Sequence, residues 1–315
     1  MDFNFELHVK TSAKGKTGIH WRNIESEEDQ CLEDTPNLIN FEVLKDKNGQ
    51  RFIVNDLIDE YKPSLLIFRE EGKLLLEVSG IESPKRSQEL GRKVLNLIVW
   101  IVDDLPDNEK IIRMIAYSAI QNFLHKDSSF SEMVEKSISF YQLEEFKVDI
   151  PGIHKFIDDL QTKYNQYFTN LKPNSESQIE SKSDDYLHKL AEELQKYCLP
   201  KKWNSWNGEK SNGVLVVITD SLSKNTILHN VGVWRGFASN VEAPLKPVVQ
   251  TLEKKTEIPA ETPEIPPHTS QNNGLIILVI VGILVILVII VSTTLQLQNQ
   301  PQIEPTPQPQ PQGIL

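Results

Sequence analysis

The chain has little cysteine: only Cys31 and Cys198 occur in 315 residues. Neither lies in a Cys-x-x-Cys pair, and neither has a histidine at the short spacing of zinc ligands. The seven histidines are also scattered along the chain. A disulfide framework and a metal site are therefore not expected, and both thiols suit a reducing compartment. We expect no cofactor either.

Positive charge is scarce as well. Lysine and arginine number 33 against 44 aspartates and glutamates, which gives a formal net charge of -11. A protein that binds nucleic acid needs a positively charged surface to contact the phosphates, and this balance opposes one. Nucleic acid is therefore not expected as a partner.

The amino terminus lacks the basic segment and the following apolar segment of a signal peptide. One long apolar run is present instead near the other end, from Leu275 through Gly282 to Val291, without an ionisable residue. With its flanks it forms the segment 274–295, which as a helix reaches the ~30 Å of a bilayer core. We expect a tail-anchored, single-pass membrane protein whose N-terminal domain is cytoplasmic.

The expected span contains no charged group of the kind that lines a pore or a proton path. Gly282 has no second small residue at the spacing of a helix dimerisation motif. The span is therefore predicted to be an anchor. One alternative stays open, in which the anchor oligomerises and the protein is an effector that disrupts a membrane.

Residues 1–145 are predicted to form an α+β domain. Its sheet is expected to be an antiparallel β-meander of about four to five strands covered by helices. The strands are expected at 3–10, 41–44, 51–54, 64–69 and 73–78, with hairpin turns at 48–49 and 70–72. The helices are expected at 87–104, 109–124, 129–141 and, beyond this domain, 152–171.

The rest of the chain is predicted to be less compact. A helical extension (146–173) and a polar linker (174–185) precede a small α/β region (186–243), which we expect to dock on the first domain as an appendage. A Pro/Glu-rich spacer (244–273) leads to the transmembrane helix (274–295), and a Gln/Pro-rich, disordered tail (296–315) follows it.

A loop that joins a strand to a helix, at 79–87, is a candidate site for an anionic small molecule. Backbone N–H groups at a helix start favour an anion. Four cations add local positive charge: Lys85, Arg86, Arg92 and Lys93. The alternative interpretation is that Ser83 or Ser87 caps the helix and the cations stay solvated or pair with nearby glutamates.

Large aromatic residues gather in the small region together with an arginine. They are Trp203, Trp206, Trp234 and Arg235. Such residues are typical of a surface that binds a protein partner. They are equally typical of a region that docks onto a larger domain, and we favour docking because large aromatic side chains are mostly buried.

Catalytic motifs are incomplete. Residues 14–17 end like a phosphate-binding loop, but Lys10 stands where that loop needs its first glycine. Residues 98–104 imitate the apolar strand of an ATPase, yet they fit the end of a buried helix better. Glu77 resembles the acidic strand position of metal-dependent nucleases, but Ser79 replaces the lysine that such a site requires. The loop after Asp220 lacks the serine of a metal-ion adhesion loop.

The sequence therefore predicts a non-enzymatic adaptor or sensor, tethered to a membrane, that binds a protein partner or an anionic small ligand. The alternative from another class is a membrane-tethered enzyme that acts on a nucleotide or phosphate, using residues 14–22 or 80–92.

Overall fold

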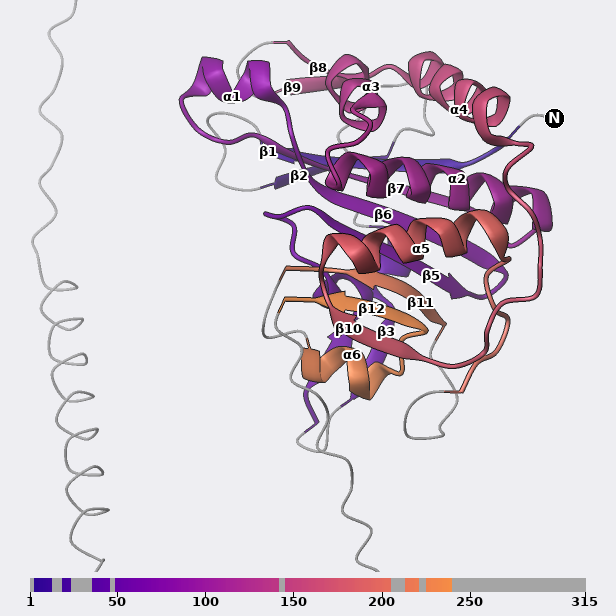
Figure 1. Cartoon of the computed structure of the whole chain (residues 1–315). Coiled ribbons are helices and arrows are strands. Elements are labelled where there is room, and N and C mark those ends of the chain that lie inside the picture. Colours follow the sequence, from indigo (N-terminus) through magenta and orange to yellow (C-terminus); the bar gives the residue numbers. More distant parts are fainter. Residues whose placement is uncertain are drawn as a thin grey trace, which may run out of the picture. The chain divides into compact units, whose positions relative to one another are not determined.

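In the computed structural model, an eight-stranded sheet forms the centre of the unit Met1–Lys246 (Figure 1). The structure describes residues 3–12, 19–23, 36–45, 49–141, 145–204, 213–220 and 225–239. The expected spacer, membrane anchor (Leu275, Gly282, Val291) and tail lie outside these ranges. Within them, no helix is both long and apolar enough to cross a bilayer.

The central sheet has eight strands in the order β10-β12-β11-β5-β6-β7-β1-β2. Their bounds are β1 Glu6–Ser12, β2 Ile19–Asn23, β5 Ser64–Glu70, β6 Lys73–Glu82, β7 Leu95–Asp103, β10 Gln178–Ser181, β11 Val214–Ile218 and β12 Arg235–Ala238. Neighbours from β11 to β2 are antiparallel, whereas β10, β12 and β11 are parallel. The α+β class is confirmed, with a sheet that is larger than expected and mixed.

Helices cover both faces of this sheet. One face packs against α2 (Pro106–Phe123), α3 (Ser129–Ser137), α4 (Ile150–Tyr164) and α5 (Asp184–Lys196). The other face packs against α6 (Asn225–Val231), the 3-10 helices η1 (Asn37–Asn40) and η2 (Val54–Leu57), and the hairpin of β3 (Glu42–Lys45) and β4 (Arg51–Ile53). The short helix α1 (Pro84–Leu90) joins β6 to β7, and β8 (Ile138–Tyr141) pairs with β9 (Glu145–Val148).

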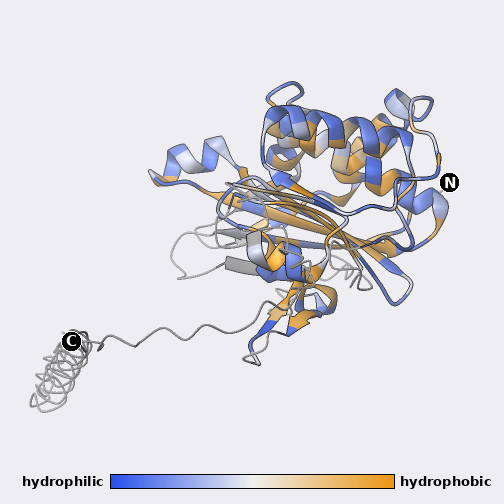
Figure 2. Cartoon of the chain, turned by 60° about the horizontal axis from the view of Figure 1, so that its bottom comes forward, coloured by the Kyte–Doolittle hydropathy of each residue, from blue (hydrophilic) through white to orange (hydrophobic). Residues whose placement is uncertain are grey.

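Because helices cover both faces of the sheet, the prediction of a helix at 87–104 is wrong. The segment 87–104, expected as a helix, contains α1 and then β7. In β7, Ile98 and Trp100 pack on the α2 side while Val99 packs on the α6 side. A strand that is buried on both faces is apolar throughout and loses the alternating pattern. Figure 2 shows this as hydrophobic colour along the strands and hydrophilic colour on the outer helix surfaces.

Other elements follow the sequence closely. The hairpin expected at 64–69 and 73–78 is β5 and β6, and its turn has positive φ at Glu71 and Gly72. The helix expected at 109–124 is confirmed as α2. The helix expected at 129–141 ends at Ser137, where β8 begins, and the one expected at 152–171 ends at Tyr164.

The segment 174–185, expected as a linker, contains β10 and the start of α5. The sequence of β10 resembles a polar loop because β10 is a short strand at the edge of the sheet, where none of its side chains is fully buried. Strands from both ends of the compact unit thus share one sheet, so the region after residue 185 completes the sheet as well as packing on it.

A buried charged network joins α2 to the end of α5. The Arg113 guanidinium is fully buried and donates to the carbonyl oxygens of Thr169 (3.0 Å), Leu194 (2.8 Å) and Tyr197 (2.8 Å). One turn earlier, the Glu109 carboxylate accepts the backbone N–H of Leu199 at 2.7 Å. The bonds from Arg113 to Leu194 and Tyr197 satisfy carbonyl groups that the end of α5 leaves without helical partners.

Candidate functional site

Two neighbouring hollows lie at the end of the sheet where β6 ends and β7 begins. The smaller one, which we call the basic cavity, has a volume of about 100 Å³. Its polar lining residues are Lys10, Glu60, Tyr61, Arg92, Lys93 and Asn96. The larger one, the adjoining cleft, has a volume of about 660 Å³ and shares Tyr61, Lys93 and Leu95 with the basic cavity.

Local structure brings the cations of the basic cavity together from two segments. Lys10 lies on β1 opposite Leu97 of β7, on the face away from Val9 and the α2 side of the core. Arg92 and Lys93 follow Gly91, which ends α1 in the left-handed conformation at φ 61°. The Ser87 hydroxyl accepts the backbone N–H of Val94 at 2.9 Å and so holds the start of β7 against α1.

The charge of the basic cavity is opposite in sign to that of the whole chain. Three cations and one carboxylate line it, which leaves two positive charges in excess. Lys10 Nζ lies 2.6 Å from Glu60 Oε1, and Lys93 Nζ lies 3.8 Å from Glu82 Oε2 outside the cavity. In a chain with a net charge of -11 this is a local reversal. The ligand that such a cavity attracts is an anion.

Asn96 gives the cavity a fixed wall. Its side chain is buried, donates to the Ile81 carbonyl at 3.2 Å and accepts the Thr11 hydroxyl at 2.6 Å. Both polar ends of this amide are thus used within the fold. Asn96 shapes the site, and the cations supply the attraction.

The four cations predicted from the sequence separate into two pairs. Arg92 and Lys93 line the basic cavity, whereas Lys85 and Arg86 line neither the cavity nor the adjoining cleft. Arg86 instead lies 4.8 Å from the centre of the Phe140 ring and pairs with Glu89 at 2.8 Å.

The serine before the helix does not have the predicted role. Ser83 precedes α1 but makes no capping hydrogen bond, and its hydroxyl donates to Glu135 Oε2 at 2.5 Å. Sequence reasoning missed Lys10, which no local pattern connects to residue 92. Its only signal was a cation at a polar position of an alternating strand.

A buried acid lies close to this site. Glu77 on β6 is fully buried opposite Leu66 and Val99, and its carboxyl oxygens accept no hydrogen bond from a described residue. Burial raises the pKa of Glu77 to about 8, with repulsion from Glu60 adding to the increase and Lys10 opposing it. The group is therefore mostly protonated at neutral pH, and it does not cancel the positive charge of the basic cavity.

The surroundings of Glu77 do not resemble a nuclease centre. The hydroxyl of Ser79, two residues after Glu77, donates to the Asp59 carbonyl at 3.2 Å, as does the Ser64 hydroxyl at 3.0 Å. In the described part of the chain, no three His, Cys, Asp or Glu side chains lie close enough to hold a metal ion.

The described strands next to the two ATPase-like segments are β1, which precedes residues 14–17, and β7, which contains residues 98–103. β1 and β7 are antiparallel, so that Thr11 is opposite Asn96 while Glu6 is opposite Ile101. The end of β1 and the end of β7 are therefore far from each other. Asp104, just after β7, pairs with Arg69 at 3.0 Å and with Lys201 at 2.8 Å. Residues 14–18 lie outside the described ranges, and β2 follows them.

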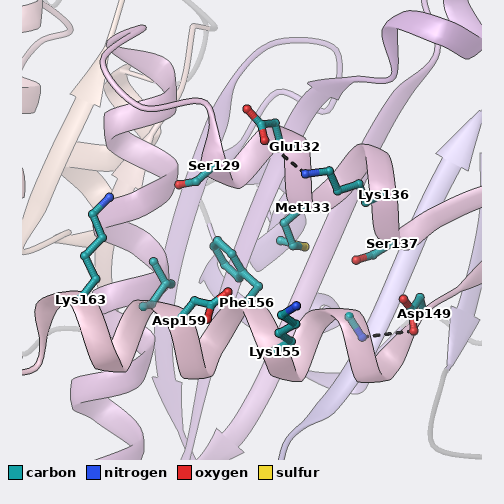
Figure 3. Close-up of a pocket in the computed structure, with 12 residues that line it drawn as sticks. Ser129, Glu132, Met133, Lys136, Ser137, Asp149, Lys155, Phe156, Asp159 and Lys163 are labelled. Carbon is teal, nitrogen blue, oxygen red and sulfur yellow. Dashed lines mark hydrogen bonds and ion pairs between the residues drawn. The ribbon is translucent and has the colours of Figure 1, made fainter.

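A third hollow is the groove between α3 and α4, with a volume of about 400 Å³ (Figure 3). Its floor is apolar, formed by Met133, Phe156 and Leu160. Charges of both signs lie along its rim: Glu132 and Lys136 on α3, Asp149 before α4, and Lys155, Asp159 and Lys163 on α4. Three cations and three anions leave no charge in excess, and Glu132 pairs with Lys136 at 3.3 Å. The rim therefore suits a protein surface better than a small anion.

The predicted aromatic cluster is largely interior. Trp203, Trp234 and Arg235 are 7%, 1% and 3% exposed. The indole N–H groups donate to the Gly232 and Asn174 carbonyls, both at 2.8 Å. Arg235 makes a two-pronged contact with Glu193 at 2.7 and 2.5 Å. Arg235 thus joins β12 to α5, while the two tryptophans bind the backbone at Gly232 and Asn174, and we do not propose these side chains as a partner surface. Trp206 lies outside the described ranges.

The chain matches no protein-family model, no curated protein and no solved structure, so its proposed function rests on the geometry described above.

Proposed function

We propose that this protein is a membrane-tethered, non-enzymatic sensor whose cytoplasmic unit binds a small anionic ligand in the basic cavity. The observation that supports this most is the convergence of Lys10, Arg92 and Lys93, from two separate segments, on one cavity of about 100 Å³. The segment 275–291 would hold this unit at the membrane surface.

The size and the walls of the cavity suit a compact anion such as phosphate. A volume of about 100 Å³ equals that of roughly three water molecules. Lysine and arginine make short, charge-assisted hydrogen bonds to phosphate oxygens, and arginine provides a planar pair of donors. A group of this size therefore reaches all three cations at once.

The lining favours binding over catalysis. Among the described residues that line the basic cavity, the single carboxylate is Glu60, and it already accepts from Lys10 at 2.6 Å. General acid-base or nucleophilic chemistry needs such a group to be available to the substrate. Release of phosphate from a nucleotide by the purified protein would favour the membrane-tethered enzyme instead.

Anion binding is tested by titration calorimetry of the full-length protein in detergent with inorganic phosphate and sulfate. The double variant Arg92→Gln/Lys93→Gln is expected to weaken binding by at least about tenfold, because each lost charge-assisted contact is worth roughly 1.5–3 kcal/mol. The matched control is Lys85→Gln/Arg86→Gln, which removes two cations of the same segment that do not line the cavity. Equal losses in both variants would contradict the proposal.

Membrane attachment has its own test. The full chain is expected to stay in the membrane pellet after carbonate washing, and a variant without residues 274–295 is expected in the supernatant. Recovery of the intact chain in the supernatant would remove the tether from the proposal. Toxicity that depends on assembly of this segment would favour the membrane-disrupting effector.

An adaptor role with a protein partner is the second candidate, favoured by the groove between α3 and α4. An amphipathic helix places apolar side chains three and four residues apart, which suits the apolar floor, and its flanking charges would oppose those of the rim. The charge-swapped variant Lys155→Glu/Asp159→Lys should lose a partner that the wild type retains. The matched control is the swap Lys189→Glu/Glu192→Lys on α5.

A further inference from the structure

We infer that the anionic ligand is a nucleotide, with a phosphate in the basic cavity and the nucleoside in the adjoining cleft. The inference rests on the proposed function and adds the class of ligand. It depends on four features of the two hollows: the difference in their charge, the position of Tyr61 between them, the close backbone packing of the cleft wall, and the polar groups in the cleft.

Of the two hollows, only the basic cavity has an excess of positive charge among its described lining residues. The adjoining cleft is lined by Lys93 and Lys126 and by Glu82 and Asp127, so that two cations face two anions. Burial raises the pKa of Asp127, but hydrogen bonds from Ser129 and Lys163 outweigh this effect and lower the pKa to about 2. Asp127 is therefore charged at neutral pH. A ligand that fills both hollows has its negative charge at one end and a neutral group at the other.

Tyr61 is an aromatic platform at the border between the hollows. It lines both of them, and it is 72% exposed although it is large and apolar. Its backbone is held in place, because its N–H donates to Asp59 Oδ1 at 2.9 Å. An exposed ring on a held backbone beside a cleft offers a surface on which a planar base can stack.

The wall of the cleft beside Tyr61 is closely packed at the backbone. Gly80 has φ 71°, and a Cβ atom there would lie 2.1 Å from the carbonyl carbon of Lys62. The end of β6 thus contacts the segment after Tyr61 through backbone alone. The chain also turns beside the cleft at His125, which has φ 54° and follows α2. A volume of about 660 Å³ lies within the range of about 300–1,000 Å³ of small-molecule sites.

Polar groups suited to the edges of a base line the same cleft. Asn122 is near the end of α2, and His125 follows that helix. An amide and an imidazole each provide a donor and an acceptor, which is the combination that reads a base. These groups are better suited to hydrogen bonds with a neutral nucleoside than to binding a second phosphate.

The test is a titration series on the full-length protein in detergent, with inorganic phosphate, ribose 5-phosphate and the four nucleoside monophosphates. At least one nucleotide is expected to bind about tenfold more tightly than ribose 5-phosphate because of base stacking. Tyr61→Ala should remove that difference and leave the affinity for ribose 5-phosphate unchanged. The matched control, Tyr167→Ala, removes a tyrosine that is 59% exposed and lines neither hollow.

The outcomes separate the inference from the proposed function. Binding of phosphate and ribose 5-phosphate with no preference for any nucleotide would overturn the inference and leave the anion sensor intact. Binding of none of these ligands would overturn both. An equal loss of ribose 5-phosphate and nucleotide affinity in Tyr61→Ala would assign Tyr61 a structural role and would also contradict the inference. A phosphoserine peptide that binds more tightly than every nucleotide would also contradict the inference.

Discussion

Replacement of Glu77 by leucine is expected to stabilise the protein at high pH and to have much less effect at low pH. Glu77 is fully buried between the apolar neighbours Leu66 and Val99 on the adjacent strands. Burial raises its pKa from the ordinary 4.5 to about 8. Between these values the folded protein holds the proton more tightly than the unfolded chain does. The free energy of unfolding therefore decreases as the pH rises through this window.

The size of the effect follows from the two pKa values. Each pH unit between 4.5 and about 8 is worth about 1.36 kcal/mol. The full loss of stability is thus roughly 5 kcal/mol above pH 8 and about 3 kcal/mol at pH 7. Glu77→Leu lacks the titrating group, so its advantage over the wild type should grow with pH by these amounts. Groups that both proteins share cancel in the comparison.

The assay is urea unfolding of the compact unit Met1–Lys246 at pH 5 to 9, followed by tryptophan fluorescence, to which the fully buried Trp100 contributes. The control is Glu192→Gln, which removes an exposed carboxylate on α5. A constant difference between wild type and Glu77→Leu at all pH values would refute the reasoning. A difference that reverses, with the wild type gaining stability as the pH rises, would show that Glu77 is ionised and paired with Lys10.

Three further substitutions test the fold. Arg113→Leu removes a fully buried guanidinium and its hydrogen bonds to three carbonyl groups, one of which is itself buried, and it should cost about 3–5 kcal/mol in urea unfolding. An unchanged unfolding midpoint would contradict this. Gly80→Ala should lower the free energy of unfolding by more than the roughly 1–3 kcal/mol that an alanine in the left-handed conformation costs by itself. Gly72 has a similar φ but open space around it, so Gly72→Ala should cost only the strain of that conformation. A smaller loss for Gly80→Ala than for Gly72→Ala would contradict the close approach to Lys62. Arg235→Lys should lower the thermal midpoint, because a lysine cannot make the two-pronged contact with Glu193, and no change would show that this contact adds nothing.

The elements that sequence reasoning predicted best are those with local signals. The β5–β6 hairpin has a turn whose Gly72 adopts positive φ, and α2 has apolar residues at helical spacing over its full length. The same reasoning failed for β7, where cover on both faces removes the alternation that identifies a strand. It failed for β10 because a four-residue polar strand is defined by its partner β12, more than fifty residues later.

The candidate site was predicted only in part for a similar reason. Arg92 and Lys93 were proposed from the positive charge near a helix start. The structure shows that Lys85 and Arg86 lie in the first turn of α1 and line neither hollow, and that Arg86 contacts Phe140 and Glu89 instead. Lys10 joins the site through the pairing of β1 with β7, and strand pairing across more than eighty residues has no local signature.

The position of β12 in the sheet has a consequence for how the protein is made. β12 lies between β10 and β11, and among the described strands it is the only one that pairs with β10. A chain that stops before Arg235 would therefore lose two strands from the sheet although it lacks only one. During synthesis, the β5–β6 hairpin can pair early, whereas β10 can pair only after β12, the last described strand, has been made. Distant pairings of this kind form slowly. Ala238 must leave the ribosome before that edge of the sheet can close.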